Sequence, residues 1–128
     1  MRQKITSTKG APPMGIYSPA ILTEGKTLYV SGQGPVNVKG EIVGATFEEQ
    51  AIITFNNIST LLEAGGTSWE NVVKVGVFLT NLDNFAEMNR IYKEYLTEPY
   101  PARTTVQAVL FEGAQIEVDC IALVPDEA

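Results

Sequence analysis

The sequence contains no histidine, one cysteine and three arginines. The absence of histidine excludes Ser-His-Asp and Cys-His nucleophilic schemes, histidine general-base catalysis and the usual zinc sites. Chemistry carried out by this chain must therefore depend on carboxylates, hydroxyls, lysine, arginine or the backbone. The single cysteine, Cys120, has no intrachain disulfide partner, so nothing indicates an oxidising compartment and we expect a cytoplasmic protein.

Basic residues are scarce as well. Nine Lys and Arg face fifteen Asp and Glu, which gives a net charge of −6. This charge opposes generic attraction to phosphate backbones and anionic membranes. The three arginines, Arg2, Arg90 and Arg103, cannot form an arginine-rich stripe of the kind that follows nucleic acid. A local basic patch is still compatible with this composition, but neither nucleic acid nor a membrane is expected as a partner.

Long apolar runs are also missing. No run reaches the length of about eighteen apolar residues that a transmembrane helix needs, and the charged N-terminus lacks the apolar stretch of a secretory signal. The composition is ordinary in other respects, with 45% hydrophobic and 19% charged residues among 128. We expect one globular domain over residues 1–128, long enough to bury a core without disulfides or a structural metal.

Short extended runs alternate with turn residues in the first third of the chain. Two hairpins are predicted there, with strands 21–23 and 27–31 around the turn 24–26, and strands 36–38 and 41–43 around the turn 39–40. Residues 32–35 between the hairpins, Gly-Gln-Gly-Pro, are expected to be irregular.

Two helices are predicted by capping residues and apolar spacing. Thr46 and Glu49 form a capping box, so a helix is expected over residues 47–64, with Gly65-Gly66 as a left-handed stop. Asp83 is expected to cap a second helix that ends before Pro99 and Pro101. Its apolar side consists of Phe85, Met88, Ile91, Tyr92 and Tyr95.

The remaining segments are typical of strands. Residues 72–80 are apolar on both parities, which predicts a central strand. Residues 103–111 and 115–124 are predicted to pair as a hairpin around the turn 112–114. With about six strands and two helices, the expected fold class is α+β, with both helices on one face of the sheet.

Arg103 and Glu117 are the principal candidates for chemistry. Arg103 follows Tyr-Pro-Ala, where the proline stiffens the approach to the strand, and its guanidinium could clamp a carboxylate bidentately. The alternative is a solvent-facing arginine at a strand end. Glu117 lies opposite the apolar face of its strand, on a face that is half polar and half apolar, which a second subunit could cover.

The predicted hairpin separates these two charges. It places Arg103 opposite Leu123, and six residues at about 3.3 Å each put Arg103 and Glu117 on the order of 20 Å apart in one chain. A small substrate could touch both only across a subunit boundary.

Tyr17, Ser31 and Cys120 are the other side chains considered for a functional role. Tyr17 and Ser31 lie next to Gly15 and Gly32, where a ligand can approach the backbone closely, although both could be ordinary surface turn residues. Cys120 shares the apolar face of its strand and has no neighbour to activate it, so we assign it to core packing.

Five segments carry a resemblance to a known family: Gly-Ile-Tyr-Ser-Pro-Ala at 15–20, Val-Ser-Gly-Gln at 30–33, Asn-Leu-Asp-Asn-Phe-Ala-Glu-Met-Asn at 81–89, Tyr-Pro-Ala-Arg-Thr-Thr-Val at 100–106 and Ile-Glu-Val at 116–118. Together they resemble the Rid family of reactive intermediate (enamine/imine) deaminases, also known as YjgF-like proteins or L-PSP endoribonucleases. The resemblance covers almost the whole chain, and Pro-Ala-Arg-Thr is its most specific part.

The resemblance implies a chorismate-mutase-like six-stranded mixed sheet in a homotrimer around a central β-barrel, with ligand sites between subunits. It implies that 2-aminoacrylate-type enamines, released by pyridoxal-phosphate enzymes, tautomerise to imines and are hydrolysed to 2-keto acids and ammonia, with no cofactor and no metal. Arg103 would hold the substrate carboxylate and Glu117 would activate water. The other implied pocket residues are Tyr17, Ser31, Gly32, Asn89 and Thr105.

The sequence departs from the family at three positions. Ile16 and Pro19 stand where many members have Pro and Gln, and Thr105 stands where many deaminases have Cys. Thr105 can still donate a hydrogen bond, so the change bears on substrate preference more than on hydrolysis. A ribonuclease and a non-catalytic carboxylate-binding module remain the alternative functions.

Overall fold

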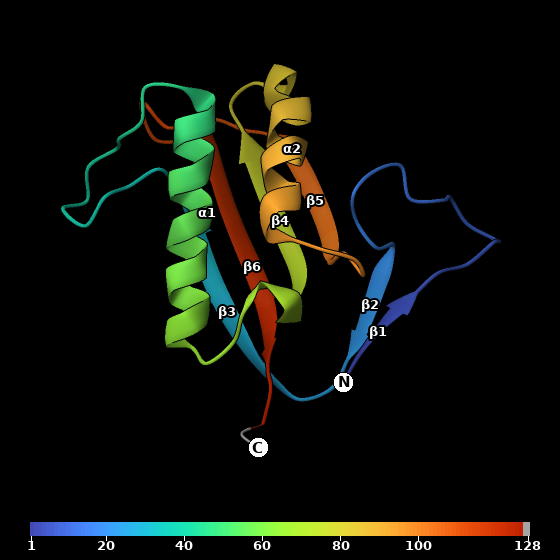
Figure 1. The fold of residues 1–128 in the computed structure, drawn as a ribbon. Coiled ribbons are helices and arrows are strands. Elements are labelled where there is room, and N and C mark those ends of the chain that lie inside the picture. The colour runs from blue at the N-terminus through green and yellow to red at the C-terminus, as the bar shows by residue number, and fades with distance from the viewer. Residues whose placement is uncertain (127–128) are drawn as a thin grey trace.

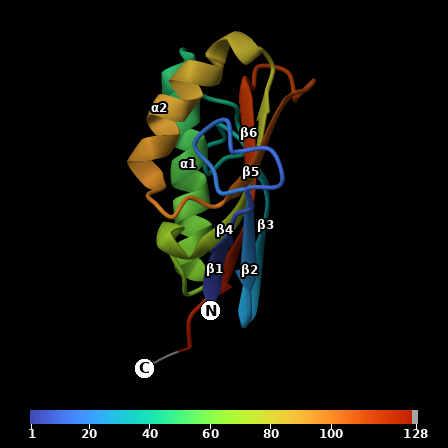
Figure 2. The ribbon, with the colours of Figure 1, turned by 90° about the vertical axis from the view of Figure 1, so that its right-hand side faces the viewer.

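Two helices cover one face of a four-stranded sheet in the computed structural model, which describes residues 1–126 (Figure 1). The sheet has the order β3 (Lys26–Gln33), β6 (Ile116–Val124), β4 (Val72–Leu79), β5 (Ala102–Gln107), and the helices are α1 (Phe47–Ala64) and α2 (Phe85–Tyr95). Figure 2 shows both helices on one side and leaves the other sheet face uncovered. The α+β class and the placement of the helices are as predicted.

The six strands form two sheets rather than the single six-stranded sheet that was expected. β1 (Arg2–Ile5) and β2 (Ala20–Thr23) make a separate antiparallel pair, beside the β5 edge of the main sheet (Figure 1). Arg2 fastens this pair, since its guanidinium donates to the carbonyl oxygens of Glu70 and Pro99.

β4 is an internal strand, as its composition predicts. It pairs antiparallel with β6 on one side and parallel with β5 on the other. Val75, Val77 and Leu79 are fully buried under the helices. A strand with apolar side chains on both of its faces gains most from burial in the middle of a sheet.

Two predicted hairpins are wrong in their pairing. β2 and β3 follow each other in the chain, but β2 pairs with β1 and β3 pairs with β6. β5 and β6 do not pair either, because β4 lies between them. Short connections favour hairpins locally, whereas the internal place that β4 requires decides the pairing here.

The loop after β3 also differs from its prediction. Gly32 and Gln33, expected to be irregular, belong to β3, and the irregularity is a register shift between Val30 and Gln33. The second hairpin is reduced to one bridge between Val36 and Ile42. Its turn is as predicted, since Gly40 has a φ of +82°.

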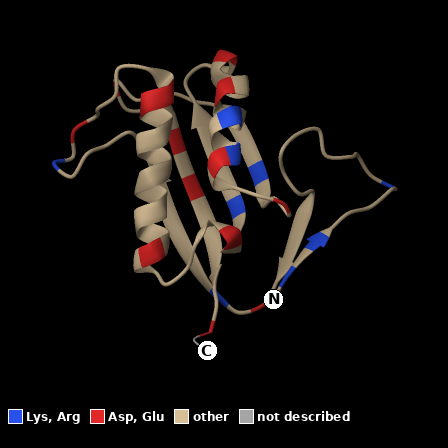
Figure 3. Cartoon of the chain, viewed as in Figure 1, with Lys and Arg blue, Asp and Glu red and all other residues tan. Residues whose placement is uncertain are grey.

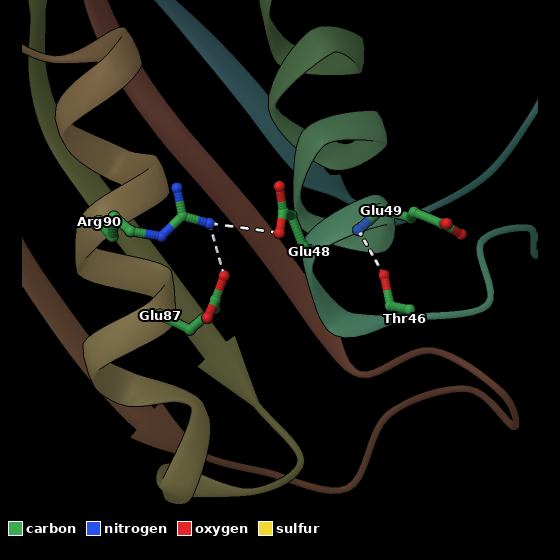
Figure 4. Close-up of polar contacts among 5 residues, drawn as sticks. All are labelled: Thr46, Glu48, Glu49, Glu87 and Arg90. Carbon is green, nitrogen blue, oxygen red and sulfur yellow. Dashed lines mark hydrogen bonds and ion pairs between the residues drawn. The ribbon is translucent and has the colours of Figure 1, made fainter.

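α1 begins and ends as predicted. The Thr46 hydroxyl accepts a hydrogen bond from the Glu49 backbone N–H at 3.1 Å (Figure 4). The Glu49 carboxylate accepts from the Ala45 N–H at 2.7 Å, one residue earlier than a standard capping box requires. Gly66, with a φ of +82°, provides the left-handed stop. Within residues 1–126, neither helix is long and apolar enough to cross a membrane.

The start of α2 differs from its prediction. Asp83 lies inside a 3₁₀ turn, Leu82–Asn84, and the Asn81 side chain caps that turn by accepting from the Asp83 N–H at 2.9 Å. α2 then begins at Phe85. Asn and Asp cap equally well, so the sequence alone does not separate these neighbours. On the predicted apolar side Met88, Ile91 and Tyr92 are fully buried, whereas Phe85 is 38% exposed.

The two helices are joined by one exposed charge cluster. Arg90 of α2 lies 3.4 Å from a carboxylate oxygen of Glu48 on α1 and 2.6 Å from one of Glu87, three residues earlier on its own helix (Figure 4). Exposed ion pairs contribute little stability. Arg90 therefore has carboxylate partners already and is a poor candidate for binding an anionic ligand.

Cys120 should be inert in the folded protein. Its side chain is 2% exposed, and burial raises the pKa of the thiol to about 12, with Asp119 acting in the same direction. Because only the thiolate reacts, the native protein should show no reaction with a thiol reagent at pH 8. The denatured protein should titrate one thiol per chain. Rapid labelling of native protein would contradict the assignment to the core.

Removal of the α1 cap should weaken the fold by about 1 kcal/mol. The substitution is Thr46→Ala, and the measurement is urea unfolding at a fixed protein concentration. Thr60→Ala is a matched control, because the Thr60 hydroxyl bonds only to the Asn56 carbonyl within the same helix. That control should stay within about 0.5 kcal/mol of the parent. Equal effects of both substitutions would refute the capping role.

Candidate active site

Arg103 lies on the helix-covered face of the sheet, at the start of β5. It is paired with buried Val75 of β4, so its side chain runs beneath α2. Its Nη1 donates to the Asn89 Oδ1 at 2.8 Å, and its guanidinium carbon lies 4.8 Å from the Tyr92 ring centroid. Asn89 is thus brought to Arg103, as expected, and the alternative of a solvent-facing arginine is wrong.

Arg103 has no carboxylate partner among the described residues. Burial lowers the pKa of its guanidinium, while Tyr92 and Tyr17 act in the opposite direction. An arginine keeps its charge even so. Arg2 and Arg90, by contrast, are engaged by carbonyl and carboxylate oxygens. Arg103 is therefore the arginine that can bind an anion.

Tyr17 reaches Arg103 from the loop between β1 and β2. A Cβ atom on Gly15 would lie 3.4 Å from the Tyr17 ring and 3.9 Å from the Arg103 Nη2, so Gly15 lies beside both side chains. The next residue, Ser18, anchors the loop, because its N–H donates to the Pro101 carbonyl oxygen at 3.0 Å. The loop is thereby attached to the start of β5.

A cavity of about 360 Å³ opens beside the guanidinium. Thr105, two residues after Arg103 on the same strand face, has a buried hydroxyl without a hydrogen-bond partner among the described residues. We name this group the arginine half-site and define it as Tyr17, Phe85, Asn89, Arg103 and Thr105; the lining of the cavity is Met14, Tyr17, Phe85, Arg103, Thr104 and Thr105.

Glu117 lies on the uncovered face of the sheet. It is paired with Phe78 of β4 and lies against Gly32 of β3, where a Cβ atom would come within 2.5 Å of the Glu117 Oε2. Only glycine at position 32 allows this carboxylate to rest on the neighbouring strand. Ser31 precedes Gly32 and lines a separate cavity between β3 and α1. We name Ser31, Gly32 and Glu117 the glutamate half-site.

One chain does not bring the two half-sites together. Arg103 is paired with Val75 and Glu117 with Phe78, an odd number of residues apart on β4, so the two side chains point to opposite faces. Two strand spacings of about 4.8 Å and three rises of about 3.3 Å place their Cα atoms roughly 14 Å apart. The predicted pairing of Arg103 with Leu123 is wrong, since Leu123 pairs with Thr27.

The charged residues of the sheet differ from strand to strand. The central strands carry acidic residues on β6 and basic residues on β4 and β5 (Figure 3). Glu117 and Asp119 face the uncovered side from β6, beside Phe78 and Gly76. Lys74 on β4 donates to the Thr104 hydroxyl at 3.0 Å. Lys74 has the same parity on β4 as Gly76 and Phe78, so the uncovered face holds this lysine as well as the two carboxylates. The helix-covered face holds the Arg103 guanidinium, which has no carboxylate partner among the described residues.

Two residues beside the Arg103 guanidinium were not predicted to be there. Phe85 and Tyr92 were assigned to the apolar side of α2, yet both rings lie against the guanidinium. The guanidinium carbon is 5.6 Å from the centroid of the Phe85 ring. Their spacing from Asn89 contains a signal for this, because positions 85, 89 and 92 share one helix stripe. An amide in the middle of an apolar stripe indicates a polar partner beneath the helix.

Comparison with known proteins identifies relatives over most of the chain. The family described as Endoribonuclease L-PSP matches residues 8–124. A protein from Dermatophagoides farinae named 2-iminobutanoate/2-iminopropanoate deaminase is 38% identical over 125 residues, covering 95% of this chain and 97% of that protein. The mitochondrial protein mmf2 of Schizosaccharomyces pombe is 43% identical over 112 residues, or 84% of this chain and 87% of that protein.

A solved structure has the same fold. The RidA protein of an Antarctic Psychrobacter is 38% identical, with a TM-score of 0.73, and the match covers 95% of this chain and 99% of that one. Sequence and fold thus agree over nearly the whole chain. The chain belongs to the Rid family, whose sequence description is Endoribonuclease L-PSP.

Proposed function

We propose that this protein hydrolyses 2-imino acids, formed by tautomerisation of 2-aminoacrylate-type enamines, to 2-keto acids and ammonia. The observation that carries the proposal is the half-buried Arg103, a cation beside a cavity with no carboxylate partner among residues 1–126. Such a guanidinium fits the carboxylate that every 2-imino acid carries. Relatives named 2-iminobutanoate/2-iminopropanoate deaminase support the same reaction.

The reaction makes modest demands on the protein. Arg103 binds the substrate carboxylate, with Tyr17, Asn89 and Thr105 around it. Glu117 orients a water molecule and accepts its proton as the oxygen bonds to the imine carbon. That proton then passes to nitrogen, and ammonia leaves as the hydroxyl gives its remaining proton to the Glu117 carboxylate and becomes the keto-acid carbonyl. An iminium carbon is already electrophilic, so carboxylates, hydroxyls and arginine are sufficient, and the proposal includes neither a cofactor nor a metal.

The proposed site lies between copies of the chain. The arginine half-site of one copy would meet the glutamate half-site of the next, since the two lie on opposite sheet faces within one chain. The uncovered face also exposes apolar side chains that a neighbour would bury, including Tyr29 at 72% and Val106 at 41% exposed. We propose a homotrimer around a central β-barrel, as the family resemblance implies.

A ribonuclease is the second candidate, favoured by the family description. Against it stand the net charge of −6 and the absence of histidine, which leave little equipment for binding or cleaving a phosphodiester. A non-catalytic carboxylate-binding module would share Arg103 and lack the role of Glu117.

The proposed compartment is the cytoplasm. The only cysteine is a buried free thiol, which fits a reducing environment. The S. pombe relative bears a mitochondrial name, so a second reducing compartment is the alternative.

Replacement of Arg103 by alanine should abolish turnover. A dehydratase acting on L-threonine supplies the imine, and appearance of 2-ketobutyrate is followed with and without the protein. We expect kcat/KM to fall at least roughly a hundredfold, because a charge-assisted bidentate contact is lost. Arg90→Ala, which removes an exposed ion pair, is the matched control and should keep full activity. Full activity of Arg103→Ala would refute the assignment, and RNA cleavage abolished by it would favour the ribonuclease.

Glu117→Gln tests both the water-activating role and the shared site. By itself it should lower kcat on the order of a hundredfold or more while binding of 2-ketobutyrate persists. Mixed and refolded with Arg103→Ala, it should restore about one quarter of the wild-type activity, because random assembly gives each cleft a one-in-four chance of two intact half-sites. A mixture as inactive as its components would contradict a site between copies.

A further inference from the structure

A single stripe of α2 surrounds the Arg103 guanidinium. Phe85, Asn89 and Tyr92 are spaced by four and three residues, so all three project from one side of the helix. The guanidinium carbon lies 5.6 Å from the Phe85 centroid and 4.8 Å from that of Tyr92, and Asn89 accepts from Nη1 at 2.8 Å. The cation is thus held by two π faces and one amide oxygen.

The Tyr92 ring is the rigid member of this group. It is fully buried, and it packs edge-to-face on Phe55 of the core, with ring centroids 6.2 Å apart and an interplanar angle of 77°. Phe85 is 38% exposed and lines the cavity, so it has freedom that Tyr92 lacks. The position of the guanidinium is therefore set chiefly from the Tyr92 side.

The Tyr92 hydroxyl is unusual for a core residue. It is buried and has no hydrogen-bond partner among the described residues. Burial raises the pKa of this hydroxyl well above its usual range, and the nearby charge of Arg103 acts against the rise. A phenylalanine would fill the same space without burying an unsatisfied oxygen, so packing alone does not account for tyrosine here.

The contacts of the guanidinium also determine which edge it presents. Nη1 is already hydrogen-bonded to Asn89. Nη2 lies toward Gly15, which belongs to the same loop as Tyr17, a residue of the cavity lining. A carboxylate in the cavity would therefore meet the Nη2 edge. An arginine whose plane is already fixed loses less side-chain freedom when it binds.

We propose that Tyr92 is a positioning residue that holds the Arg103 guanidinium in the plane required for capture of the substrate carboxylate, with its buried ring as the fixed surface. The inference rests on the proposed function, in which Arg103 binds that carboxylate. Tyr92 touches Arg103 and not the substrate, so it acts on binding rather than on water addition.

Three substitutions test the role against simple packing. Tyr92→Phe keeps the ring and removes the hydroxyl, and Tyr92→Leu removes the π face. Tyr95→Leu is the matched control, because Tyr95 belongs to the same helix and stacks on Phe55 at 5.0 Å but makes no contact with Arg103. For Tyr92→Leu we expect KM to rise roughly tenfold with kcat little changed, since a desolvated cation–π contact is worth about that factor.

Tyr92→Phe should retain most of the affinity that Tyr92→Leu loses, and Tyr95→Leu should leave KM unchanged. The decisive measurement compares binding of 2-ketobutyrate with binding of its neutral amide by calorimetry. The clamp acts only through the carboxylate, so Tyr92→Leu should reduce the preference for the acid over the amide. A merely structural defect would weaken both ligands equally, and that result would overturn the proposal.

Two measures keep the outcomes separate. If Tyr92→Leu does not fold, Tyr92→Met replaces it, because methionine adapts to irregular core space and also lacks the π face. It should reduce the same acid preference several-fold, and an unchanged preference would refute the role of Tyr92. Wild-type turnover in the same assay reports on the proposed function. Normal turnover with an unaltered acid preference in the variants would overturn the inference alone.

Discussion

The structure depends on the burial of β4 in the middle of its sheet. This strand is apolar on both faces, so an edge position would leave hydrophobic side chains in water. Its internal position requires a strand on each side, which separates β5 from β6 even though they follow each other in the chain. Arg103 and Glu117 are consequently placed across β4 from each other and on opposite faces. The division of the site follows from this single hydrophobic requirement.

The position of β5 also leaves Arg103 half-buried and without a carboxylate partner among residues 1–126. Placing Arg103 beneath α2 removes part of its hydration, which opposes the charged state. Two aromatic rings and an amide oxygen offset part of that loss without neutralising the charge. An acidic neighbour would stabilise the arginine better and would also occupy it. The protein therefore keeps a fixed positive charge available to an anion in the adjoining cavity.

The proposed assembly gives the uncovered sheet face a role. In one chain that face carries Glu117 beside exposed apolar side chains, and the helix-covered face carries Arg103. An interface that buries the apolar residues would also bring a carboxylate toward a neighbour's guanidinium. Catalysis would then require assembly, because neither half-site contains both the anion-binding and the water-activating group.

Features with local physical causes could be predicted from the sequence. The Thr46 cap and Gly66 stop determine the length of α1, and the apolar faces of β4 and β6 identify their buried sides, including Cys120. The family resemblance implied one pocket that also contains Tyr17, Ser31, Gly32, Asn89 and Thr105. Within one chain Tyr17, Asn89 and Thr105 lie near Arg103, whereas Gly32 lies against Glu117. That one chain cannot join Arg103 to Glu117 was predicted as well, although from the wrong register.

Only the tertiary structure decided how the strands pair and what surrounds Arg103. The predicted hairpins relied on short connections, but strand order depends on burial summed over the whole sheet, which no local segment contains. Tyr92 lies on an apolar helix stripe, and although Asn89 in that stripe indicates a polar partner, the contact with Arg103 arises only once β5 lies beneath α2. By itself the sequence determined its elements and their apolar faces, since these depend on neighbouring residues. The fold decided the pairing of distant segments, because that pairing is a property of the packed whole.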